Sequence, residues 1–227
     1  MLTDAQLDAL ARLAADAVVL AVRWGPADPG PIAPADDMLT TPGASFVTLR
    51  HGTAVRGCVG SLSAYRALHR DVAENARAAA LRDQRFEPLL PAELAETHVE
   101  VAVLTATSLM PFADERDLYG QLRPGVDGLI VAYEDVLATY LPEVWDLHPE
   151  PEQFVAELRL KAGIDPAVPV SDLAFQRFAA RHSALVSLDR EAVRRRDLKA
   201  TWWRWRWHAR EQVRRLVRRQ ATHASQR

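Results

Sequence analysis

The chain has 227 residues, 48% of them hydrophobic, and a net charge of −2. That length predicts one domain, or one domain with a small satellite, and the apolar content is sufficient for a core. No run of about 18 apolar residues occurs, and no basic region precedes an apolar one near the N-terminus, so we expect a cytoplasmic protein with neither a membrane span nor a secretory signal.

The first elements in chain order are a helix and a loop. Apolar residues recur at helical spacing over residues 3–23, and Thr3 with Gln6 forms a capping box at the start of this segment. Residues 26–43 contain five prolines and two glycines. Both residue types interrupt helices and strands, so this segment is expected to be a loop.

A hairpin and a second helix follow. Residues 45–50 and 53–59 predict two paired strands, and residues 64–81 predict a helix for which Ser63 is the N-cap candidate. Such a junction of strand, glycine and helix would leave backbone N–H groups free near Cys58. Free N–H groups at a helix start favour an anion or a thiolate.

The second half of the body predicts a strand, a hairpin and a helix. Valines alternate with other residues over 99–103, which predicts a half-buried strand with Glu100 facing away from the valines. The remaining expected elements are a hairpin over residues 129–133 and 136–140 and a helix over residues 152–162. Residues 174–180 fit either a strand or a short helix.

Charge is distributed unevenly along the chain. Residues 194–227 contain twelve basic and two acidic residues, a net of +10, which leaves −12 for the rest. We therefore expect an α+β body over 1–186 and a basic, Trp/Arg-rich C-terminal extension, or arm, over 187–227. Four roles remain open for this arm: binding RNA, an acidic membrane surface or an acidic partner, or folding back on the body.

Reactive chemistry is concentrated at one position. Cys58 is the only cysteine, and it lies between Gly57 and Gly60. Arg56 is two residues away, so in a regular strand both side chains point to one face, where a guanidinium would favour the thiolate. Free cysteines are also often packed as small hydrophobes. A reactive residue and a packed residue are both consistent with the pattern.

Six segments resemble, in the same order, the signature segments of the AMMECR domain family. The first is VRGCVG at residues 55–60, and together they run from about Phe46 to Ile164. The other five are RDQRFEPLLPAEL, VEVAVLT, GVDGLIV, ATYLPEVW and LRLKAGI.

This resemblance implies an α+β fold with a body of two subdomains, built from antiparallel hairpins with flanking helices. In bacteria it also implies the A component of the so-called AmmeMemoRadiSam set. The partners would then be a Memo-like protein and a radical S-adenosylmethionine protein. The resemblance implies no particular reaction.

In the enzyme hypothesis, Cys58 is the nucleophile for an anionic or electrophilic substrate. Arg56 stabilises the thiolate or the substrate, and Asp83 orients Arg56 or Arg85. A cysteine enzyme needs a base, for which the candidates are His69 and His98. The residues expected to contribute to substrate binding are Gly57, Gly60, Arg85 and Glu100.

We expect no metal and no cofactor. The seven histidines lack metal-type spacing, and the chain contains no phosphate loop or dinucleotide fingerprint. The rival hypothesis is a non-catalytic module that binds protein or RNA. In that case the VRGCVG segment is a structural joint.

Overall fold

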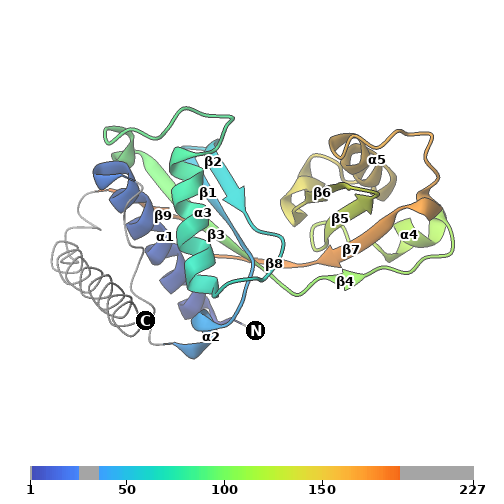
Figure 1. Ribbon diagram of the computed structural model, residues 1–227, viewed down its shortest axis with the longest axis horizontal. Coiled ribbons are helices and arrows are strands. Elements are labelled where there is room, and N and C mark those ends of the chain that lie inside the picture. The colour runs from blue at the N-terminus through green and yellow to red at the C-terminus, as the bar shows by residue number, and fades with distance from the viewer. Residues whose placement is uncertain (1, 26–35, 190–227) are drawn as a thin grey trace, which may run out of the picture.

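The computed structural model describes residues 2–25 and 36–189, which form two α+β lobes (Figure 1). Each lobe is built on an antiparallel sheet, as expected for the fold class. The C-terminal arm falls almost wholly outside the described residues, as does most of the predicted N-terminal loop. The described end of that loop contains a short helix that we did not predict, α2 (Asp37–Thr40).

The first lobe contains a sheet in the order β2-β1-β3-β8, with β9 also paired to β3. The predicted hairpin of β1 and β2 is confirmed, and the valines of β3 are buried as expected. The strand bounds in this lobe are β1 (Ser45–His51), β2 (Ala54–Gly60), β3 (Thr97–Leu104), β8 (Ala180–His182) and β9 (Val186–Ser187).

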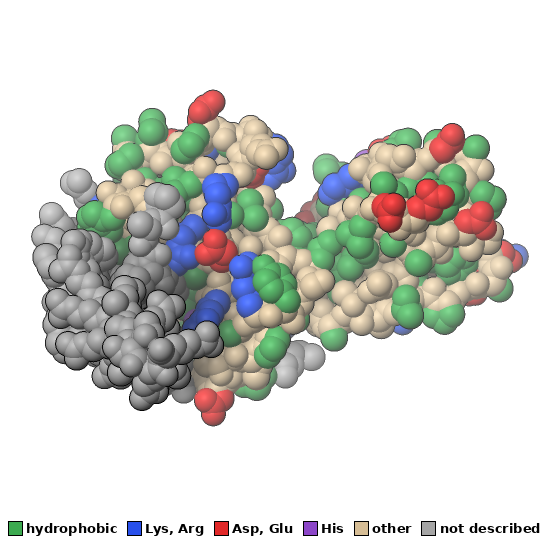
Figure 2. Space-filling model, in the orientation of Figure 1, with side chains coloured by type: hydrophobic (Ala, Val, Ile, Leu, Met, Phe, Trp, Pro, Cys, Tyr) green, Lys and Arg blue, Asp and Glu red, His purple; other side chains and the backbone are tan. Residues whose placement is uncertain are grey.

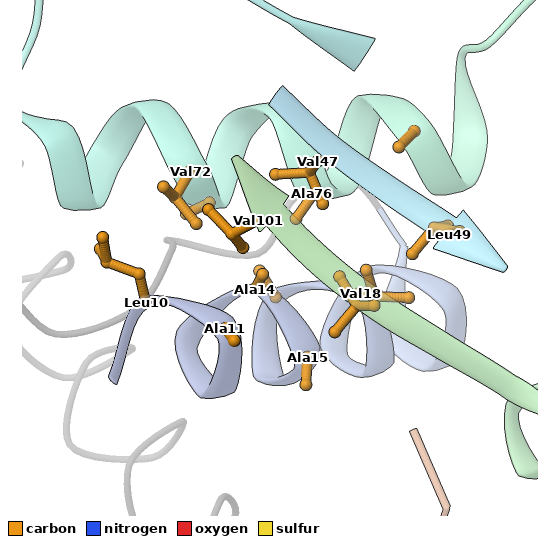
Figure 3. Close-up of a cluster of buried hydrophobic side chains, with 14 of the residues drawn as sticks. Leu10, Ala11, Ala14, Ala15, Val18, Val47, Leu49, Val72, Ala76 and Val101 are labelled. Carbon is orange, nitrogen blue, oxygen red and sulfur yellow. The ribbon is translucent and has the colours of Figure 1, made fainter. Parts of the chain in front are cut away.

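Two helices cover one face of this sheet. They are α1 (Asp4–Trp24), which begins with the predicted Thr3–Gln6 capping box, and α3 (Leu68–Leu81). Their side chains pack against the valines and leucines of β1 and β3 (Figure 3). Burial of this apolar face is the main force that holds the lobe together. The opposite face of the sheet carries polar side chains instead.

The predicted start of α3 was wrong. The helix begins at Leu68 rather than at residue 64, and its N-cap is Ala67, which makes no side-chain capping bond. The preceding loop is held elsewhere, because Ser61 and Arg66 both donate hydrogen bonds to the buried carboxylate of Asp71. Cys58 therefore does not lie at a helix N-terminus, so the N–H groups at the start of α3 do not adjoin it.

The second lobe contains a sheet in the order β4-β7-β5-β6. The expected hairpin of β5 and β6 is confirmed, and residues 174–178 are a strand rather than a helix. The elements of this lobe are β4 (Ser108–Leu109), α4 (Glu115–Gln121), β5 (Gly128–Tyr133), β6 (Val136–Tyr140), α5 (Pro151–Lys161) and β7 (Ala174–Phe178), with short 3-10 turns η2 (Pro142–Asp146) and η3 (Val170–Asp172).

Extended segments connect the lobes: β3 leads to β4, and β7 leads back to β8 (Figure 1). A small apolar cluster packs where they meet, with Leu104 from the first lobe and Ile130 and Phe178 from the second. After β8 the chain pairs with β3 again through β9, and Leu188 is buried in the core of the first lobe. The expected body boundary at residue 186 therefore falls within β9.

None of the helices in the described residues combines the length and the apolar character that crossing a membrane would require.

Candidate functional site

The polar face of the first sheet is ordered by strand register. Thr48 on β1 lies opposite Cys58 on β2 and opposite Glu100 on β3, so these three side chains form a row across the sheet. Ala102 on β3 lies opposite His182 on β8 and begins the neighbouring row. Directly opposite residues have Cβ atoms about 5 Å apart, so each row is a set of neighbours.

A cavity of about 480 Å³ separates this polar face from the second lobe. Its volume is within the range of small-molecule sites. Figure 2 shows the notch between the lobes, with Lys or Arg side chains on both of its sides. The polar and charged lining residues are Thr48, Arg50, Cys58, Arg85, Glu100 and His182 from the first lobe, and Thr139, Tyr140, Glu143 and Lys161 from the second.

Cys58 is half-buried, and its side chain lines this cavity. The hydroxyl of Thr48 lies 3.3 Å from the sulfur. The backbone of Cys58 is held on its free edge, because its N–H donates to Asp83 Oδ2 at 2.8 Å and its carbonyl accepts from Arg85 Nη2 at 3.1 Å. These contacts fix the backbone from which the sulfur projects.

Asp83 and Arg85 form the bridge between the segment after α3 and the edge strand β2. Arg85 donates to Asp83 Oδ1 from Nε at 3.0 Å and to Oδ2 from Nη2 at 2.7 Å. The hydrogen bond from Arg85, with that from the Cys58 N–H, holds the pKa of the Asp83 carboxyl well below its ordinary value. Of the two arginines that we expected Asp83 to orient, it contacts Arg85.

Arg56 does not lie beside the Cys58 side chain, and the shared strand face was wrongly predicted. Register shifts between Leu49 and Arg50, which leaves Arg56 as the extra residue of a β-bulge in β2. Its guanidinium instead makes two hydrogen bonds to Glu93, of 2.7 and 3.1 Å, and one to the carbonyl of Glu87. Arg56 is not among the residues that line the cavity.

The two glycines of the segment are required by packing. A Cβ at Gly57 would lie 2.2 Å from the carbonyl oxygen of Ala79 in α3, and a Cβ at Gly60 would lie 2.2 Å from the ring of Phe46. Contacts this short exclude any side chain without movement of a neighbour. Neither glycine lines the cavity, so the proposed binding role for Gly57 and Gly60 has no geometric support here.

His182 bridges the two lobes inside the cavity. Its Nδ1 lies 3.3 Å from Glu100, which also pairs with Arg50 at 3.4 Å, and its Nε2 contacts Glu143 in η2. The hydrogen bonds that His182 donates to Glu100 and Glu143 raise the pKa of His182 to about 9, so the imidazole is charged at neutral pH. The hydrogen bond from His182 lowers the pKa of Glu100. At Glu143 burial acts to raise the pKa, but the hydrogen bond from His182, a backbone hydrogen bond and the charge of His182 together lower it.

Lys161 is the cation that the second lobe contributes. Its Nζ donates to the carbonyl of Thr139 at 2.9 Å and lies 4.8 Å from the centre of the Tyr140 ring. Desolvation lowers the pKa of Lys161, and repulsion from Arg85 lowers it further.

The candidate bases suggested by the sequence do not reach the cavity. His69 is buried on α3 against the carbonyl of Leu39, and His98 is not a lining residue. Within residues 2–25 and 36–189, no three His, Cys, Asp or Glu side chains converge as a metal site requires. The chemistry that the cavity offers is a thiol, a hydroxyl and several charged groups.

The AMMECR1 family model matches residues 11–183, which is most of the chain and all of the elements that form the cavity. The chain belongs to the AMMECR1 family. This membership confirms the resemblance drawn from the six sequence segments.

The chain is also similar to proteins of other organisms and to one solved structure. A protein of Saccharolobus islandicus strain L.S.2.15 is 39% identical over 140 residues, covering 57% of this chain and 60% of that protein. One from Methanothermobacter thermautotrophicus is 36% identical over 126 residues, or 53% of this chain and 64% of that protein. The aligned region thus spans less than two thirds of these relatives. The crystal structure of uncharacterized protein PH0010 from Pyrococcus horikoshii superposes with a TM-score of 0.72 at 26% identity, covering 82% of this chain and 98% of that one.

Sequence reasoning missed several residues of this site, namely Thr48, Arg50 and Glu143 as well as His182 and Lys161. His182 was interpreted as an isolated histidine, and Lys161 was noted only as part of a family segment. Both reach the cavity through long-range packing, His182 through pairing of β8 with β3 and Lys161 at the last turn of α5. The sequence signal for Lys161 was its place in LRLKAGI, while His182 has no local signal.

Proposed function

We propose that this AMMECR1-family protein binds a small anionic or electrophilic substrate in the cavity between its lobes, with Cys58 as the nucleophile. The observation that carries the proposal is the position of the only sulfur nucleophile on the wall of a ligand-sized cavity, beside cationic groups from both lobes. Sulfur there can attack a bound electrophilic carbon as the thiolate, forming a C–S bond while the leaving group departs with its electron pair.

The surroundings of Cys58 support this role. Thr48 lies within hydrogen-bond range of the sulfur, and Arg85 holds the Cys58 carbonyl while its own side chain faces the cavity. The rigid backbone contact to Asp83 limits movement of the nucleophile. Positioning of this kind is a large part of what an enzyme site supplies.

Alkylation of the native protein tests the proposal. We expect iodoacetamide to add one adduct to the folded protein at neutral pH, detected as a mass increase, because Cys58 lines an open cavity. The Cys58→Ser variant should gain no adduct. Alkylation that occurs only after unfolding in denaturant would show that Cys58 is a packed residue, and the enzyme hypothesis would then be abandoned.

We also propose that the protein acts as the A component of a three-protein set, with a Memo-like protein and a radical S-adenosylmethionine protein. Family membership is the support for this partnership. Co-elution of the three purified proteins on size exclusion, and a new product formed only when all three are present, would be the expected results. Failure of both would remove the partnership and leave the cavity proposal intact.

A second candidate function is a non-catalytic module that binds protein or RNA, with the VRGCVG segment as a structural joint. The close approach of Gly57 to α3 and of Gly60 to Phe46 favours it, because packing alone explains both glycines. This reading predicts that Cys58→Ser leaves every activity of the three-protein set unchanged. The nucleophile reading predicts loss of product formation in the same variant.

A further inference from the structure

The charges that line the cavity do not balance. With His182 protonated, four cationic side chains face two carboxylates, those of Glu100 and Glu143. Both carboxylates are already engaged by His182, and Glu100 also pairs with Arg50. Of the two remaining cations, Arg85 is paired with Asp83 at the edge of the cavity, and Lys161 has no carboxylate partner among the described residues, so the site keeps a net positive charge.

Arg85 and Lys161 approach the cavity from opposite lobes. Arg85 follows α3 in the first lobe, where it pairs with Asp83, and its side chain remains 61% exposed. Lys161 ends α5 in the second lobe, where its ammonium group contacts the carbonyl of Thr139 and the ring of Tyr140. Arg85, Lys161 and Cys58 all line the same cavity of about 480 Å³, so one small ligand can contact all three side chains.

We propose that Arg85 and Lys161 together bind one oxyanion of the ligand, a carboxylate or a phosphate, next to the Cys58 sulfur. An anion between them would replace a repulsive pair of cations by two attractive contacts, one in each lobe. Its binding would therefore fasten the lobes to each other. This inference rests on the proposed function, because it uses the same cavity and assigns the chemical class of the substrate.

The selectivity of alkylation provides a direct test. Iodoacetate and iodoacetamide have the same reactive carbon, but iodoacetate carries a carboxylate beside it. Free cysteine in solution does not offer the carboxylate of iodoacetate a pair of cationic side chains. The ratio of the iodoacetate rate to the iodoacetamide rate with free cysteine is therefore the reference. We expect the ratio of iodoacetate to iodoacetamide rates at Cys58 to exceed that reference by about tenfold, which is close to the attraction between two unit charges about 4 Å apart in water.

Charge-removing variants identify the residues responsible. Arg85→Gln and Lys161→Gln should each lower the ratio by about threefold to fivefold, and the double variant should return it to the free-cysteine value. The matched control is Arg82→Gln, because Arg82 is 60% exposed, pairs with Glu74 outside the cavity, and is three residues from Arg85. This control should keep the wild-type ratio. Lys161→Gln removes no ion pair with a carboxylate, so it tests the inference even if Arg85→Gln unfolds.

The outcomes separate the inference from the proposed function. If iodoacetamide labels native Cys58 but the ratio equals that of free cysteine, the oxyanion site is wrong and the thiol site stands. If neither reagent labels the native protein, the proposed function fails first. Inorganic phosphate and acetate, added in separate titrations, should slow the reaction of iodoacetamide with Cys58. The anion that slows this reaction at the lower concentration is the preferred oxyanion. Slowing by neither would count against the inference.

Discussion

Asp83 holds three parts of the site in place through one carboxylate. It accepts the N–H of Cys58, fixes the guanidinium of Arg85, and accepts the backbone N–H of Arg85 at 3.2 Å. The side chain is buried, while Arg85 is largely exposed. A buried carboxylate whose oxygens are all used in this way stabilises the fold only while it is ionised.

Replacing this carboxylate gives the first stability prediction. Asp83→Asn should lower the free energy of unfolding at pH 7 by about 2 kcal/mol, a value reduced by the solvent exposure of Arg85. The pKa of Asp83 is lowered on folding, so its contribution is present above the ordinary value of 3.8 and is lost as pH falls below it. Urea titrations of both proteins should therefore differ fully at pH 7 and less at pH 3. Asp146→Asn, at an exposed position, is the control, and an equal loss there would contradict the assignment.

Elements were predictable to the extent that their cause is local. The capping box of α1 and the alternating valines of β3 are readable because each depends on residues a few positions apart. The bulge at Arg56 depends on the pairing of β2 with β1. The start of α3 at Leu68 rather than at residue 64 depends on the hydrogen bond from Arg66, in the preceding loop, to Asp71. Neither cause is present in a local pattern, so the face of Arg56 and the helix start were both mispredicted.

The contact between β2 and α3 predicts the cost of a side chain at Gly57. Gly57→Ala should destabilise the protein by about 2 to 3 kcal/mol, because its Cβ would meet a backbone oxygen that cannot rotate away. Gly120→Ala is the matched control, since a Cβ there meets nothing within 4 Å and alanine favours the helix. Thermal unfolding should show a clear loss for the first variant and a small gain for the second. Equal stability of the two would refute the close approach of β2 to α3.

At the scale of the whole molecule, the site exists only because two lobes face each other. Apart from the two candidate bases, the sequence placed seven residues in candidate roles: three line the cavity, Cys58, Arg85 and Glu100, and four do not, Arg56, Gly57, Gly60 and Asp83. The sequence did not predict the opposite wall, which comes from β6, η2 and α5. The charged bridge from Glu100 through His182 to Glu143 crosses this boundary, and its two ion pairs join residues 82 and 39 positions apart in the sequence. Long-range pairing of this kind is decided by the fold as a whole.

That bridge makes the stability of the molecule depend on pH in the alkaline direction. The pKa of His182 is raised on folding from 6.5 to about 9, so its contribution is complete below 6.5 and is lost as pH rises through 9. Glu100 and Glu143 stay ionised over this range because their pKa values are lowered, and Arg50 stays charged. Because the His182 side chain is 32% exposed, its contribution to the free energy of unfolding is about 1 to 2 kcal/mol after solvent screening.

Urea titrations test this contribution. Between pH 6.5 and 9.5 the free energy of unfolding of the wild type should fall more than that of His182→Gln. The control is His51→Gln, which removes an exposed pair with Glu96 and should keep the wild-type profile. Identical profiles for the wild type and His182→Gln would show that this bridge does not hold the lobes together.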